Sequence, residues 1–197
     1  LFAEALKPDD AYPLSDNVSP MVWDDAMRAA YDLVPLVKED SEDFDSAFKK
    51  HTPEPICKYV SQRLNFVRAC GVKTDRVQSV IAALILINDM VSFDSLSLGD
   101  IRTVTTLTAK AKKIHVPTPT MLAFAEKFLE ISKVPGRKPE YKRTSKMRTK
   151  ICNHIVVLAL YVEGWTLSTE SRDILAEDFR CHKERVQLHI ERVGCVR

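Results

Sequence analysis

Residues 77–91 read VQSVIAALILINDMV, and residues 151–162 read ICNHIVVLALYV. The first segment is apolar on nearly every side of a helix, which is typical of a helix buried at the centre of a fold. The second carries an apolar stripe through Ile151, Ile155, Leu158 and Val162. IAALIL at 81–86 also resembles IVVLAL at 155–160. The sequence therefore predicts two long apolar helices of similar character.

The elements that follow these helices also occur twice. After each, the pattern predicts a short extended piece (residues 93–98 and 165–167), a polar cap (Asp100 and Thr169), a short helix and an amphipathic helix. Repetition of this kind indicates two copies of one supersecondary unit. Three helices with a short strand between the first two form the skeleton of a winged helix, a relative of the helix-turn-helix. The alternative is that any mostly helical protein offers apolar helices for comparison.

We therefore predict a mainly α fold with short β segments, built from tandem winged-helix (helix-turn-helix-like) units. Residues 1–54 would form an N-terminal extended arm, punctuated by prolines, and a helix. Residues 55–134 would be the first unit, 135–146 a basic linker, and 147–197 the second unit.

Charge is distributed unevenly although the whole chain carries only +2. Residues 1–100 hold 10 Lys and Arg against 17 Asp and Glu, a net charge of −7. Residues 101–197 hold 19 basic and 10 acidic residues, a net charge of +9. Such asymmetry favours a polyanion as the partner of the second half, with the first half facing solvent or protein.

Basic residues gather in the linker and in the last predicted helix, residues 182–193. In a helix-turn-helix unit the last helix enters the major groove, so its outer face must bring cations and hydrogen-bond donors to phosphates and bases. Burial of Val186, Ile190 and Val193 would leave such a face exposed. The predicted contacts to duplex DNA are Arg137, Lys138, Lys142, Arg143, Lys146, Arg148, Lys150, His182, Lys183, Arg185, His189 and Arg192.

Residue patterns for other chemistries do not occur. The five cysteines are scattered with no C-x-x-C pair, so they are interpreted as small core residues in a reducing compartment. The five glycines are isolated, which excludes a phosphate-cradling loop. His154 lies within an apolar helix and is expected to be a core or boundary residue and not a catalytic base. We predict no enzyme, no cofactor, no metal site, and no membrane span, because no fully apolar run reaches ~18–20 residues.

Residues 147–195 resemble the C-terminal part of the A-forty-nine-like RNA polymerase I subunit family, also called polymerase-associated factor fifty-three. The resembling segments are IVVLALYV at 155–162, LAEDF at 175–179 and RVGC at 192–195. AYPLSDNVSP at 11–20 resembles the arm that precedes the same module. The order of these segments is more specific than any one of them.

This resemblance implies a tandem winged-helix module, similar in layout to the small subunit of TFIIE. The family's module lies near upstream DNA and over the polymerase cleft, and supports initiation and elongation of rRNA synthesis in the nucleus and nucleolus. A separate domain pairs with a second polymerase subunit. The family's basic positions early in the last helix fall on His182 and Arg185. The family usually continues into a wing hairpin, whereas this chain ends at Arg197, so the wing is expected to be trimmed or lacking.

A second function remains open on the sequence alone. The acidic first half and the N-terminal arm would also suit a protein-interaction scaffold within a transcription complex, without direct DNA binding.

Overall fold

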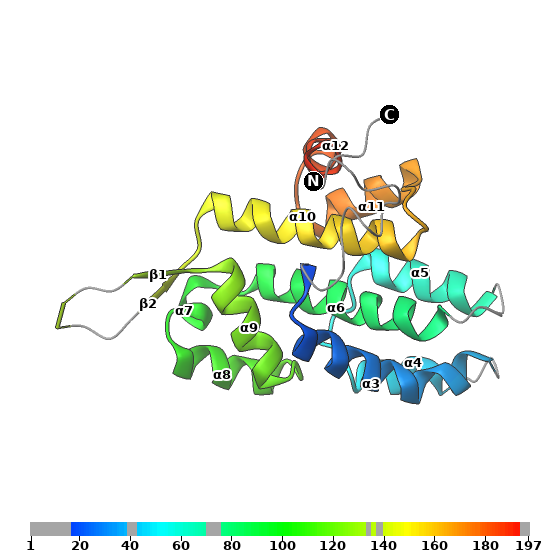
Figure 1. Cartoon of the computed structure of the whole chain (residues 1–197), viewed down its shortest axis with the longest axis horizontal. Helices are drawn as coiled ribbons and strands as arrows, with labels where there is room; N and C mark the ends of the chain where they lie inside the picture. The colour runs from blue at the N-terminus through cyan, green and yellow to red at the C-terminus, as the bar shows by residue number, and fades with distance from the viewer. Residues whose placement is uncertain (1–16, 39–42, 70–75, 133–134, 137–139, 194–197) are drawn as a thin grey trace.

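A computed structural model describes residues 17–38, 43–69, 76–132, 135–136 and 140–193 (Figure 1). These residues form ten helices and one two-stranded sheet, so the expectation of a mainly α fold with short β segments is confirmed. The predicted N-terminal arm, residues 1–16, and the chain end, residues 194–197, lie outside the described residues. In chain order the elements are α3 (Pro20–Lys38), α4 (Phe44–Lys49), α5 (Lys58–Ala69), α6 (Val77–Ser95), α7 (Leu98–Ile101), α8 (Val104–Lys113), α9 (Thr118–Phe128), β1 (Glu130–Ser132), β2 (Glu140–Lys142), α10 (Ser145–Val162), α11 (Thr169–Asp178) and α12 (Lys183–Arg192).

Helix α6 is the centre of the fold. Every side chain from Ile81 to Met90 is buried, because α3 packs on one side of the helix and α10 on another. Figure 1 shows α10 lying along α6, with α3 and α4 on the opposite side. By length and composition α6 could cross a membrane, contrary to the sequence expectation, but 67% of its apolar window is buried inside the protein. It is therefore accounted for as a core helix.

Asn88 is the polar side chain that ties the loop before α5 to this core. Its amide nitrogen donates to Thr52 Oγ1 at 2.7 Å and to the Pro53 carbonyl at 2.8 Å, and its oxygen accepts from the Cys57 backbone at 2.7 Å. All these groups are removed from water, so each bond avoids the cost of a buried unpaired polar atom. The neighbouring Asp89 is also buried, which raises its pKa well above the usual value and favours the neutral acid.

Local capping corrects the sequence expectations at several helix ends. Asp100 is not a cap: Ser97 caps α7, and Asp100 is the third residue of its capping box. Thr103 caps α8. Ser168, not Thr169, caps α11. In each case the hydroxyl oxygen accepts a backbone N–H from the first turn, which a residue already inside the helix cannot do.

The two expected extended pieces are also wrong. Helix α6 continues to Ser95, because Phe93 is fully buried and keeps the last turn packed on the core. Residues 165–167 form no strand; Gly164 and Trp165 turn the chain with φ values of 70° and 72°. Helices α10, α11 and α12 therefore follow one another without a strand between the first two.

The segment expected to be a linker, residues 135–146, is structured where it is described. Residues 140–142 form β2, which pairs antiparallel with β1 through Glu130 and Lys142, Ile131 and Tyr141, and Ser132 and Glu140. Helix α10 begins at Ser145, capped by Thr144. The hairpin extends away from the helical body (Figure 1). The boundary predicted at residue 147 thus falls inside the first turn of α10.

Candidate nucleic-acid interface

Ten of the twelve predicted DNA contacts lie on described elements, in β2, the start of α10 and the region of α12. Arg137 and Lys138 lie outside the described residues. The ten differ in what their side chains already contact. That difference decides which of them can still bind a phosphate.

Arg143 is not available as predicted, because its guanidinium ends the central helix α6. It donates to the carbonyls of Phe93 at 2.8 Å, Asp94 at 2.8 Å and Leu96 at 3.0 Å. All three lie at the C-terminus of α6, where a helix leaves carbonyls without intrahelical partners; of the three, the Phe93 carbonyl also accepts from the Leu96 N–H at 3.2 Å. Burial lowers the pKa of Arg143, and the nearby Asp94 carboxylate opposes that shift. Arg143 is a structural residue, and its assignment as a DNA contact is corrected.

Arg148 and Lys150 are partly occupied by protein contacts. Arg148 Nε pairs with Asp94 Oδ2 at 3.1 Å, and its Nη2 donates to the Phe179 carbonyl at 3.0 Å. Lys150 Nζ donates to the Lys127 carbonyl at 3.0 Å. Both side chains remain exposed. They join α10 to its neighbours and have only part of their hydrogen-bonding capacity left for a ligand.

The expectation that His189 faces outward is wrong. The ring is 2% exposed, and its Nδ1 bonds the side-chain oxygen of Asn153 on α10. Burial, reinforced by the positive charges of Arg192 and Arg185, lowers the pKa of His189 to about 4. The imidazole is therefore neutral at physiological pH and fastens α12 to α10. His154 of α10 is half-buried; burial lowers its pKa to about 4, and its Nδ1–H donates to the Lys150 carbonyl at 2.9 Å.

Arg185 and Arg192 form the free basic flank of α12. They are seven residues apart and therefore share one side of the helix. Both are exposed, and neither forms an ion pair with the described residues. Lys183, in contrast, pairs with Asp173 on α11. The exposed His182 precedes the helix as its N-cap without making a side-chain cap.

The outward-most side of α12 is not basic, which the sequence reasoning missed. Glu184, Leu188 and Glu191 cluster within one side of the helix and are all exposed. Leu188 is half exposed. The amphipathic pattern identified the buried side correctly, but two acids at helical spacing with a leucine were also visible in the sequence. The cations of α12 therefore lie on its flanks.

Lys146 is an exposed cation near the start of α10. It lies seven residues before Asn153 and so shares the face of α10 on which His189 is held. At a rise of 1.5 Å per residue, Lys146 and Asn153 are ~10 Å apart along α10. Lys146 is exposed and makes no ion pair among the described residues. Lys146 therefore lies about two turns before Asn153 on the face of α10 that contacts His189.

Arg180 is a further cation that the sequence analysis left out. It is exposed in the turn between α11 and α12, with φ 50°. Together with Arg148 and Arg185 it lines a small cleft beside Cys152 and Cys181. Burial raises the pKa of Cys152 to about 12, so the thiol is protonated there and inert. The only signal in the sequence was a basic residue three positions before the first residue of the last helix.

Comparison with known proteins places this arrangement in a family. The family model described as A49-like RNA polymerase I associated factor matches residues 2–196. The chain belongs to this family. No match was found among curated proteins, and none among solved structures. The resemblance carried by residues 11–20 and 147–195 is confirmed, and this A49-like chain is related to factors that associate with RNA polymerase I.

Proposed function

We propose that this A49-like chain is a non-enzymatic DNA-binding module of an RNA polymerase I subunit, supporting initiation and elongation in the nucleolus. The observation that carries the proposal is a set of exposed cations around the contact between α10 and α12. Arg180 and Arg185 line one small cleft, Arg192 lies on the same side of α12 as Arg185, and Lys146 lies on the face of α10 that carries Asn153. Cations without protein partners are the groups that can replace counterions along a phosphate backbone.

Two winged-helix-type units remain the proposed architecture. In the first, α6 is followed by the short α7, then by α8 and α9, which pack on each other, and then by the β1–β2 hairpin in the place of a wing. In the second, α10 is followed by α11 and α12, which also pack on each other. The missing strands between the first two helices weaken the likeness, whereas the repeated helix order and the hairpin support it.

The position of the cations favours contact with the phosphate backbone over reading of bases. Arg185 and Arg192 lie on a flank of α12, and its outward-most side carries Glu184 and Glu191. A carboxylate pointed into the major groove is repelled by phosphates. We therefore propose duplex binding with little sequence preference, in the context of a polymerase I core and a partner subunit.

A binding titration with a matched charge control tests this proposal. Fluorescence anisotropy with a random duplex should give a dissociation constant on the order of micromolar, with a salt slope that grows by ~0.9 for each phosphate contacted. The variant Lys146→Glu/Arg185→Glu/Arg192→Glu should bind about tenfold more weakly or worse. The control Arg28→Glu/Lys49→Glu/Lys50→Glu makes the same charge change on exposed residues of α3 and the α4 end. Absence of wild-type binding at low salt refutes DNA binding, and equal loss in both variants refutes the assigned surface.

A further inference from the structure

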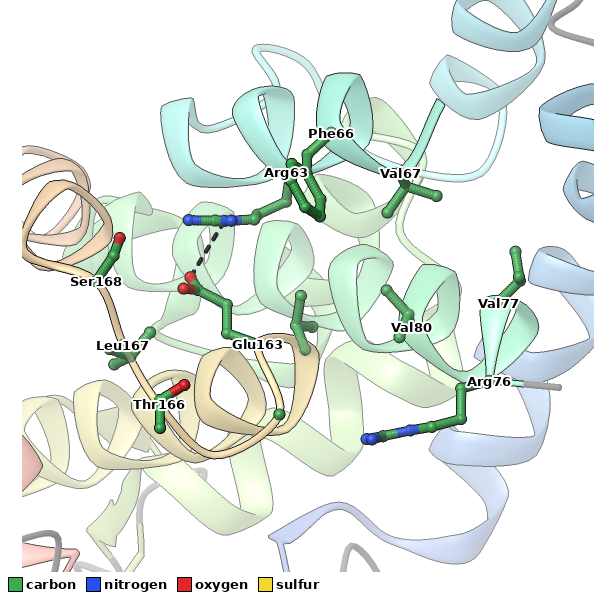
Figure 2. Close-up of a pocket in the computed structure, with 12 residues that line it drawn as sticks. Arg63, Phe66, Val67, Arg76, Val77, Val80, Glu163, Thr166, Leu167 and Ser168 are labelled. Carbon is green, nitrogen blue, oxygen red and sulfur yellow. Dashed lines mark ion pairs between the residues drawn. The ribbon is translucent and has the colours of Figure 1, made fainter. Parts of the chain in front are cut away.

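A groove at the opposite end of α10 from Lys146 is lined mainly by apolar side chains, and the proposed function does not use it. It lies between α5, the start of α6 and the turn that joins α10 to α11, and its volume is about 590 Å³ (Figure 2). That volume is within the range of ligand and peptide pockets, ~300–1,000 Å³. Because α10 is 18 residues long, the groove and the basic surface are separate sites.

The walls of the groove are apolar and include an exposed aromatic ring. Figure 2 shows Phe66 and Val67 on α5 facing Val80 on α6, with Leu167 on the third side. Phe66 borders this concave surface, but its side chain remains 57% exposed. A hollow lined in this way is the kind of surface that receives an apolar side chain from a partner.

The floor of the groove is polar but already neutralised. Arg63 Nε pairs with Glu163 Oε1 at 3.1 Å, and the two side chains are 15% and 8% exposed. Tyr59 donates to the same carboxylate at 2.9 Å, and the Arg63 guanidinium lies 5.8 Å from the centroid of the Phe66 ring. These contacts hold Arg63 and Glu163 in place. A preformed floor of this kind lowers the ordering cost of binding.

The rim of the groove is electropositive. Arg76 lies at the N-terminus of α6, stacked 4.8 Å from the Tyr161 ring centroid and donating to the Tyr161 carbonyl at 3.2 Å. A guanidinium has five N–H donors, so most remain for a ligand. The N-termini of α6 and α11 both lie at the groove, which Val77 and Ser168 help to line. The dipole of each helix adds partial positive charge there. The complementary ligand carries a carboxylate beside an apolar side chain.

We propose that this groove docks a segment of RNA polymerase I in which a leucine or aromatic side chain is flanked by carboxylates. The apolar side chain would cover Phe66 between Val80 and Leu167, and a carboxylate would pair with Arg76. This inference depends on the family's association with polymerase I and not on DNA binding, so either proposal can fail without the other.

Site-directed photo-crosslinking with the full chain and purified RNA polymerase I tests the groove. Phe66 is replaced by p-benzoylphenylalanine, and the control carries the same group at Tyr31, which is 69% exposed on α3. The expected result is a crosslink from position 66, absent from position 31, that mass spectrometry maps to one polymerase segment with an apolar residue between acidic ones. When Arg76→Glu or Arg76→Gln is combined with the photo-crosslinking residue at position 66, the crosslink yield should fall by about fivefold. The Gln variant retains a side-chain donor for the Tyr161 carbonyl, and an unchanged urea midpoint shows that the fold persists.

The proposal is overturned if the crosslink to polymerase is no stronger from position 66 than from position 31, or if the crosslinked segment is basic. It is also overturned if position 66 crosslinks to DNA or to a second copy of this chain. Finally, it is overturned if the folded Arg76 variants leave the crosslink yield unchanged. The Lys146→Glu/Arg185→Glu/Arg192→Glu variant should crosslink like the wild type. That arm separates failure of the groove from failure of the DNA interface.

Discussion

Two basic segments of this chain differ in how many of their cationic side chains contact other groups of the protein. At residues 142–150, Arg143 donates to three carbonyls, Arg148 to a carboxylate and a carbonyl, and Lys150 to a carbonyl. On α12, Arg185 and Arg192 form no ion pair among the described residues. The first segment is the more basic in sequence, yet contacts within the protein engage Arg143, Arg148 and Lys150, so only Lys142 and Lys146 are left unpaired among the described residues, no more than on α12.

The groups that surround a cationic side chain therefore decide whether it stabilises the fold or is free to bind a ligand. The start of α10 lies beside the C-terminal end of α6, where unpaired carbonyls attract guanidinium groups. The flank of α12 lies beside His189, which is neutral, and faces solvent. Three further experiments test whether the two segments differ in this way.

The largest expected effect is on stability. Arg143→Met leaves three carbonyls at the end of α6 without their donor, so we expect a loss of about 3 kcal/mol in the free energy of unfolding. Urea denaturation measures it. The control is Lys142→Met, which changes the exposed preceding residue and should cost no more than about 0.5 kcal/mol. Equal losses in the two variants would show that Arg143 is not a structural cap.

The second effect is a pH dependence that originates at His189. Its folded pKa, about 4, lies below the unfolded value of 6.5, so the unfolded chain binds the proton more readily. The stability contribution is full above pH 6.5 and is lost as the pH falls toward 4, by up to about 3 kcal/mol. His154 acts in the same sense, and the raised pKa of Asp89 acts in the opposite sense.

The measurement is therefore a difference between variants and not the wild-type profile. His189→Gln removes the titrating group and keeps an amide opposite Asn153, so the slope of unfolding free energy between pH 6.5 and 4 should flatten. His182→Gln, which alters an exposed side chain next to the same helix, should keep the wild-type slope. If both variants follow the wild type, His189 is not held neutral by burial.

The smallest effect concerns the acids on the outward side of α12. Glu184→Gln/Glu191→Gln removes two negative charges from that side, and duplex affinity at low salt should rise about three- to tenfold, with less gain at high salt. Fluorescence anisotropy measures it. Glu126→Gln, exposed on α9, serves as control. An unchanged affinity in the α12 variant would move the DNA away from this helix.

The sequence alone determined most of the secondary structure and the central helices. An apolar run such as residues 81–87 can only be stable when surrounded, so its burial in α6 followed from composition. The bounds of α12, predicted at 182–193, also followed from the spacing of Val186, Ile190 and Val193. Family membership was visible in short segments at both ends of the chain.

Tertiary structure alone decided which polar side chains are free. His189 and Arg143 have the same sequence character as exposed cations, but one meets Asn153 from another helix and the other meets the end of α6. Such partners are 36 and 50 residues away. A local pattern reports the side of a helix on which a residue lies, whereas burial and hydrogen bonding depend on what the rest of the chain brings to that side.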